Sequence, residues 1–154
     1  MSLAQNLKEI RQNIPADVTL IAVSKTQPID KIKEVYSSGH RIFGENRAQE
    51  LVSKWEALPK DIQWHMIGHL QSNKIKYIAP FVHLIHSVDS EKLLTEIDRQ
   101  GAKAGRNIPC LLQIHIAEEE TKFGFSAQEV EHFMQSDVWN QLKNISVKGL
   151  MGMA

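Results

Sequence analysis

The sequence predicts a parallel β/α protein, either an open doubly wound sheet or a (β/α)8 barrel, and three observations bear on this class. Short apolar segments rich in β-branched residues alternate with amphipathic segments, at roughly 25 residues per unit. No Gly-x-Gly-x-x-Gly follows a predicted strand, so the dinucleotide fingerprint of open sheets is missing. The 154 residues provide six strands where a closed barrel needs eight. If the sheet is a barrel, residues 1–154 form one incomplete barrel domain, truncated to about six β/α units.

The elements follow from apolar spacing and from helix stop signals. A helix is expected at 3–12, before an apolar first strand at 18–23 that lies between two prolines. Ser126 and Glu129 predict a capping box at the start of the last helix. The further strands are expected at 41–43, 62–67, 82–85, 109–116 and 147–151, and the further helices at 28–38, 47–57, 73–79, 90–104 and 126–134.

Charge and cysteine content exclude several classes of partner. Lys plus Arg and Asp plus Glu are equal at 18 each, so no net positive field draws the chain to nucleic acid or to an anionic membrane. No apolar stretch reaches the roughly 18 residues of a membrane helix. Cys110 is the only cysteine, which rules out an intrachain disulfide and fits a reducing cytoplasm.

Polar side chains follow most of the predicted strands. The carboxyl ends of parallel strands meet at one rim, where barrel active sites form. That rim would present an amine, a carboxamide and an imidazole beside small residues, a set that can bind a small polar ligand but is poor in metal ligands. The segments concerned are Ser24-Lys25, Gly44-Glu-Asn46, Gly68-His69, Ser87 and Ile116-Ala-Glu118.

Lys25 closes the first strand and has two interpretations. An amine at this rim can be desolvated, and the lower pKa that results suits Schiff-base chemistry with a carbonyl group. Alternatively, the side chain simply extends from the strand end into solvent, and from the spacing alone this is the more frequent case.

The histidines do not predict a metal site. His65 and His69 are four residues apart, but Gly68 interrupts the segment, and in a strand this spacing is too long for two ligands of one ion. His83 and His86 are expected on opposite faces of the fourth strand, as packing or surface residues.

Several motifs, taken together, resemble one family over essentially the whole chain. They are Ala22-Val-Ser-Lys-Thr26, Phe43-Gly-Glu-Asn-Arg47 with Gln49-Glu50, Ile67-Gly-His-Leu-Gln-Ser-Asn-Lys74, Lys122-Phe-Gly-Phe125 and Gly149-Leu-Met-Gly-Met153. The chain resembles the pyridoxal phosphate homeostasis proteins, whose fold is similar to the N-terminal barrel of alanine racemase.

This resemblance implies a cofactor and its residues. Lys25 would hold pyridoxal 5′-phosphate (PLP) as an aldimine, Asn46 and His69 would line the cofactor pocket, and Met151 would reach the same rim. No catalytic residue is implied. The implied role is intracellular homeostasis and delivery of PLP, with PLP-dependent apoenzymes as partners, in a protein that is a monomer when full length.

Two departures from the family pattern stand out. His115 occupies a position where the family usually carries asparagine. The family's seventh and eighth strands supply a serine-rich loop and an Arg-Ile-Gly-like segment that hold the phosphate, and these lie beyond residue 154. We therefore expect this chain alone to bind PLP weakly, to aggregate, or to pair an open sheet edge with another copy.

Two enzymatic alternatives remain beside the cofactor carrier. A PLP-dependent amino-acid racemase needs a second proton acceptor, usually a tyrosine from another domain, and Tyr36 and Tyr77 both lie in predicted helices. His69 could act as a base in its place. The other alternative is a barrel hydrolase that uses Lys25 or histidines without a cofactor.

Overall fold

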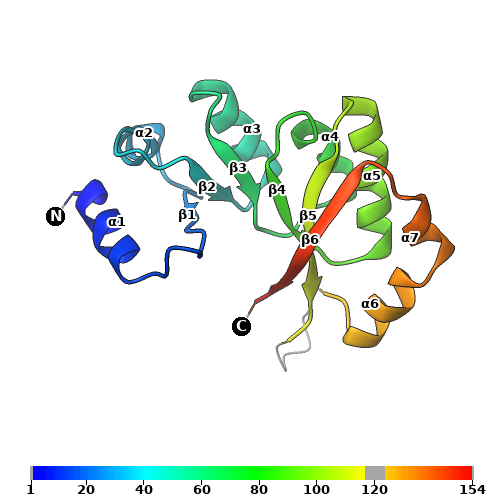
Figure 1. The fold of residues 1–154 in the computed structure, drawn as a ribbon. Helices are drawn as coiled ribbons and strands as arrows, with labels where there is room; N and C mark the ends of the chain where they lie inside the picture. The colour runs from blue at the N-terminus through cyan, green and yellow to red at the C-terminus, as the bar shows by residue number, and fades with distance from the viewer. Residues whose placement is uncertain (1, 117–123, 154) are drawn as a thin grey trace.

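The computed structural model describes residues 2–116 and 124–153. In this part of the chain, six strands form one parallel sheet in the order β1-β2-β3-β4-β5-β6. Figure 1 shows the sheet curving from β1 to β6, with the connecting helices along its outer side and α1 beside α2. The predicted parallel β/α order is therefore confirmed.

The bounds of the elements agree with the predicted order and differ mainly at their ends. The strands are β1 (Ala22–Val23), β2 (Ile42–Glu45), β3 (Gln63–Met66), β4 (Leu84–Val88), β5 (Ile108–Ile114) and β6 (Ile145–Gly152). The helices are α1 (Leu3–Gln12), α2 (Ile29–Ser37), α3 (Ala48–Ala57), the 3₁₀ turn η1 (Ser72–Lys74) that leads into α4 (Ile75–Ile78), α5 (Glu91–Ala104), α6 (Ala127–Met134) and α7 (Asp137–Gln141). The short helix α7 was not expected.

Helix ends follow the capping signals in the sequence. Ser126 and Glu129 form the predicted capping box of α6. Ser90 caps α5, which ends at Gly105 in the left-handed conformation. Gly39, directly after the C-cap of α2, also has a positive φ of 103°.

The first strand is much shorter than expected. The sequence predicts a strand over 18–23 that is buried throughout, but only Ala22 and Val23 pair with a neighbour, through Phe43 and Gly44 of β2. Val18 and Val23 are each 52% exposed. The reason is that, in the described part of the chain, β1 is an edge strand of the sheet and pairs with β2 alone.

β2 extends further than expected, through Gly44 and Glu45, which the sequence assigns to a turn. Both residues pair in the ladder, Gly44 with His65 and Glu45 with Met66. A β-carbon at Gly44 would lie 3.0 Å from Ile21 and Ile67 side-chain atoms, so the absence of a side chain lets its neighbours close over it. β4 likewise includes Ser87, which was expected after the strand.

The core lies between the sheet and its helices. Phe43, Trp64 and Ile85 on the strands pack with Leu51 of α3 and Leu94 of α5, and each of the five is at most 1% exposed. This layer fixes the helices against the sheet, and apolar burial of this kind is the main stabilising term of such a fold.

A cluster of three histidines lies on β3 and at the start of β4. His65 Nδ1 is 2.9 Å from His86 Nε2, and the His65 ring stacks on the His83 ring with their centroids 5.4 Å apart. The expectation that His83 and His86 face opposite sides is therefore wrong, because both of their rings contact the ring of His65. His83 precedes β4, so strand alternation does not govern the pair.

Burial makes this cluster sensitive to acid. His65 is 4% exposed, and desolvation, with the nearby His86 and His83, lowers its pKa to about 3. The unfolded chain takes up this proton near pH 6.5, whereas the folded chain does not. The contribution of His65 to stability is thus present above pH 6.5 and lost as the pH falls from there toward 3.

We predict that His65→Gln flattens the acid side of the stability curve. Between pH 7 and pH 5, the free energy of unfolding, measured with urea, should fall by about 2 kcal/mol more in the unmodified chain than in the variant. His132→Gln, at an exposed position on α6, is the control and should leave the pH dependence unchanged. Equal pH dependence in His65→Gln and the unmodified chain would show that His65 is not held neutral by burial.

Candidate functional site

Lys25 lies on an exposed turn directly after β1, at the carboxyl end of the sheet. Its neighbour Ser24 is only 4% exposed and continues the ladder, since its N–H donates to the Gly44 carbonyl at 3.0 Å. The turn thus starts from a fixed, buried residue and presents the next side chain to solvent.

A buried ionic network beneath this turn connects it to β2 and α3. Lys54 of α3 is centred on three acceptors: its Nζ lies 2.6 Å from the Ser24 carbonyl, 2.9 Å from Glu45 Oε2 and 2.7 Å from Glu50 Oε2. The side chains of Lys54 and Glu45 are 6% and 0% exposed. All three ammonium hydrogens therefore have partners, which a lysine buried among apolar residues requires.

The same network holds the residues on either side of Lys25. Ser24 Oγ donates to Glu45 Oε2, and the Thr26 N–H donates to Glu50 Oε2 at 2.7 Å. Thr26 has a positive φ of 62°, a backbone conformation that a β-branched residue rarely adopts. The contacts to α3 therefore stabilise a turn that its own sequence does not favour.

The two carboxyl groups of the network respond to their surroundings in opposite ways. Burial raises the pKa of Glu45, and the hydrogen bonds from Ser24 and Lys54 only partly offset this effect. Partial burial acts in the same upward direction on Glu50, but hydrogen bonds from Lys54 and from the Thr26 N–H outweigh it and lower its pKa. The two carboxyl groups thus share Lys54 as a partner, while their surroundings shift their pKa values in opposite directions.

Asn46 and His69 line one cavity of about 330 Å³. Asn46 follows β2 directly, and Gly68 packs so closely against it that a β-carbon there would lie 2.5 Å from the Asn46 carbonyl oxygen. Arg47 and Lys74 add two cationic side chains to the lining, which also includes Ala48, Gln49, Met66, Leu70 and Gln71. The cavity thus offers amide, imidazole and cationic donors to a polar ligand.

His69 has an orienting partner that sequence reasoning missed. Its Nδ1 lies 3.2 Å from Asp89 Oδ2, and Asp89 comes directly after β4. The signal was present, because Asp89 follows a predicted strand as His69 does, but the sequence gives no distance between the two strand ends.

The four predicted site residues are only partly brought together. Asn46 and His69 share a cavity, while Lys25 is not part of its lining. The parallel register still places Lys25 level with Asn46, since each comes two residues after a member of the pair Val23 and Gly44. Met151, half-buried on β6, pairs with Gln113 of β5 at the opposite edge of the sheet.

Other candidate residues have less defined surroundings. His115 Nε2 is buried without a hydrogen-bond partner among the described residues. Ala117 and Glu118 of the fifth strand end, and Lys122 and Phe123 of the later motif, lie outside the described residues.

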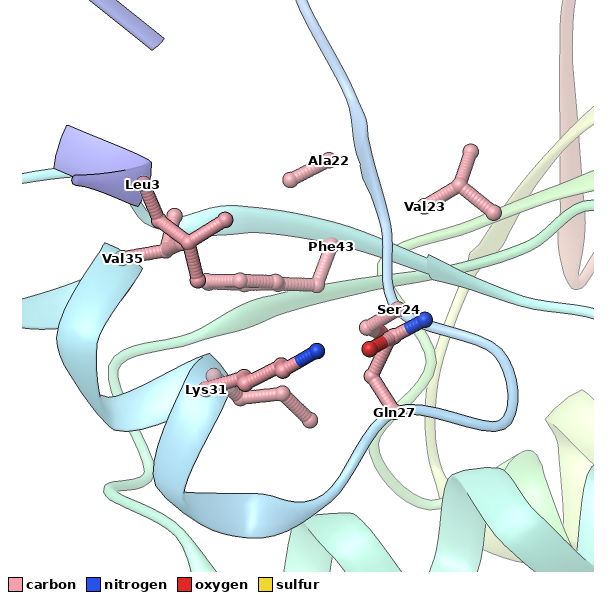
Figure 2. Close-up of a pocket in the computed structure, with 9 residues that line it drawn as sticks. Leu3, Ala22, Val23, Ser24, Gln27, Lys31, Val35 and Phe43 are labelled. Carbon is pink, nitrogen blue, oxygen red and sulfur yellow. The ribbon is translucent and has the colours of Figure 1, made fainter. Parts of the chain in front are cut away.

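A second cavity of about 360 Å³ lies beside β1, between α1 and α2 (Figure 2). Its walls are largely apolar, and in Figure 2 Gln27 lies next to Ser24 while Lys31 points toward both. It contains none of the four predicted site residues. The lining residues are Leu3, Ala22, Val23, Ser24, Gln27, Lys31, Ile32, Val35 and Phe43.

Residues 2–116 and 124–153 contain no group of three or more His, Cys, Asp or Glu side chains arranged to hold a metal ion. Within those same ranges, no helix is both long and apolar enough to cross a membrane.

Comparison with known proteins places this chain in a family. The family model described as alanine racemase, N-terminal domain, matches residues 1–154. A pyridoxal phosphate homeostasis protein of Aquifex aeolicus is 39% identical over 133 residues, which are 86% of this chain and 58% of that protein. A protein of the same name from Vibrio alginolyticus is 33% identical over 165 residues, covering 97% of this chain and 70% of that protein.

Solved structures agree with this placement. PipY of Synechococcus elongatus, without PLP, superposes with a TM-score of 0.93 at 36% identity, covering 99% of this chain and 71% of PipY. PipY with PLP bound gives a TM-score of 0.88 at the same identity over 98% of this chain. An alanine racemase of Clostridium difficile, at 15% identity and a TM-score of 0.79, shares the fold.

The chain thus spans 58% and 70% of the length of these two homeostasis proteins and 71% of the length of PipY. Its six-stranded sheet corresponds to part of a (β/α)8 barrel of the alanine racemase N-terminal type, as the sequence predicted. It belongs to the alanine racemase N-terminal domain family and, within that family, to the pyridoxal phosphate homeostasis proteins.

Proposed function

We propose that this chain binds PLP and serves its homeostasis and delivery in the cytoplasm. The observation that carries the proposal is the exposed Lys25 on a turn that a buried ionic network holds at the carboxyl end of the sheet. The name of the relatives and the structure of PipY with PLP bound, at 36% identity, support the choice of cofactor.

The residues of the site suit this cofactor. PLP carries an aldehyde, and Lys25 Nζ can condense with its carbon, forming a carbon–nitrogen double bond and releasing water. Asn46 and His69 supply an amide and an imidazole in one cavity, where they would orient the ring. Met151, at the carboxyl end of β6, would contribute an apolar contact at the same rim. When bound, the cofactor supplies an electron sink, which is its own chemistry.

We infer that the protein carries the cofactor rather than turning over a substrate, with PLP-dependent apoenzymes as recipients and a monomer as the full-length state. The naming of the relatives supports this role. A PLP-dependent racemase is the alternative, and the contact between His69 and Asp89 is the one observation that favours it, because a carboxylate orients a histidine base.

We predict that Lys25 is the residue that bonds to PLP. After incubation with excess PLP and borohydride reduction, peptide mass mapping should find the label on Lys25, because reduction also captures a weakly held cofactor. Lys25→Ala should abolish both the label and the visible absorption band while the melting temperature stays unchanged, since an exposed turn side chain contributes little to the core. Lys76→Ala, at an exposed position on α4, is the control. A label on Lys74 or Lys76 in the unmodified chain would overturn the assignment.

A second prediction concerns the ring contacts. Asn46→Ala and His69→Ala should each weaken PLP retention by about 1–3 kcal/mol, the cost of losing a buried hydrogen bond. Equilibrium dialysis against PLP measures this directly, and His132→Ala provides an exposed histidine control. Unchanged affinity in both variants would remove Asn46 and His69 from the cofactor site.

The racemase alternative makes a different prediction. A racemase exchanges the α-proton of its amino acid with solvent, so L-alanine in heavy water would gain deuterium in the presence of the PLP-loaded chain. We expect the rate of deuterium incorporation to equal the rate measured in a control mixture of free PLP and the Lys25→Ala protein. A clear excess that His69→Ala abolishes, together with the formation of D-alanine, would instead establish the racemase.

A further inference from the structure

We infer that Glu50 and Lys54 of α3 are positioning residues that fix the direction in which Lys25 points toward the cofactor. The inference rests on the proposed function in one respect, namely that Lys25 is the residue that bonds to PLP.

Both peptide groups that flank Lys25 are held by α3. In the group before it, the Ser24 carbonyl accepts from Lys54 Nζ at 2.6 Å. In the group after it, the Thr26 N–H donates to Glu50 Oε2 at 2.7 Å, and the Lys25 carbonyl accepts from Thr26 Oγ1 at 2.6 Å. With both peptide planes fixed, the α-carbon of Lys25 and the direction of its Cα–Cβ bond, from which the side chain extends, are fixed as well.

The conformation of Thr26 shows that this arrangement is imposed. A threonine at φ 62° is in a region that its branched side chain disfavours. Such a residue persists only where its surroundings determine it, and the partner that meets its N–H is the Glu50 carboxylate. The spacing of Glu50 and Lys54, one helical turn apart, allows one helix face to hold both peptide groups.

The network also reaches the second part of the site. Glu45 accepts from both Ser24 and Lys54, and Asn46 is the next residue along the chain. The side chain of Glu45 is 0% exposed, so β2 cannot shift at this point without breaking the contact. Lys54 therefore sets the distance between the turn of Lys25 and the start of the Asn46 cavity.

The best variant to test is at Glu50. A substitution of Lys54 would leave Glu45 buried without its cation and would destabilise the fold itself. Glu50 is 25% exposed, and its removal leaves Lys54 bonded to Glu45 and Ser24. Glu96 of α5 is a matched control, because it is 21% exposed and also pairs with a cation on its own helix, Arg99, but it does not contact the turn.

The experiment combines two readouts on Glu50→Ala, Glu50→Gln and Glu96→Ala. Amide hydrogen exchange of Thr26, measured by NMR without PLP, reports whether the hydrogen bond from the Thr26 N–H to Glu50 is present. The rate of borohydride-trapped labelling of Lys25 at limiting PLP reports the positioning. In Glu50→Ala we expect Thr26 to lose protection and labelling to slow about tenfold. Glu50→Gln, which keeps an acceptor oxygen, should recover part of both, and Glu96→Ala should change neither.

Three outcomes would overturn the inference. Thr26 could keep its protection in Glu50→Ala, labelling could stay unchanged after protection is lost, or Glu96→Ala could slow labelling as much as Glu50→Ala does. A failure of the proposed function is recognised separately, because no label would then appear on Lys25 in the unmodified chain. In that case, loss of Thr26 protection in Glu50→Ala would still establish that Glu50 holds the Thr26 N–H. The role of Glu50 in positioning Lys25 for PLP would be refuted.

Discussion

The buried ammonium of Lys54 is the contact on which the site depends. It joins the turn after β1, through the Ser24 carbonyl, to β2 through Glu45 and to the first turn of α3 through Glu50. Removing one partner of such a buried pair typically costs about 3–5 kcal/mol, because the remaining charge stays in a poorly solvated place. The network is thus costly to break and holds its members in one arrangement.

This arrangement gives α3 two roles. Leu51 packs into the core between helix and sheet, and Lys54 and Glu50 reach the carboxyl end of the strands. The same helix that stabilises the domain therefore sets the position of Lys25. A shift of α3 against the sheet would move the groups that bond to the turn and so displace Lys25. The closely packed layer between helix and sheet resists such shifts.

Much of the fold follows from local signals in the sequence. The limits of α2, α5 and α6 follow from capping residues and glycines, because these act within one turn of the chain. The ends of the strands do not follow from such signals. Residues 19–21 would belong to β1, and Gly44 and Glu45 belong to β2, only if a neighbouring strand pairs with them. That pairing depends on residues distant in sequence.

The site shows the same division. Lys25, Asn46 and His69 could be selected because each follows a predicted strand, and parallel strands end at one rim. Lys54 was not selected, although it lies three residues after Leu51 and so on the buried side of α3, where a lysine needs partners. Its partners Ser24 and Glu45 come from other segments, so the network became visible only when the strands were placed.

A crystal structure of the PLP-treated, borohydride-reduced chain tests the central claim most directly. We expect density for the cofactor that is continuous with Lys25 Nζ, with its ring near Asn46 and His69. We also expect that Lys54 Nζ stays within hydrogen-bond distance of the Ser24 carbonyl, and Glu50 within that of the Thr26 N–H. Cofactor bonded to another lysine, or a turn that has left α3 in the bound state, would contradict this expectation.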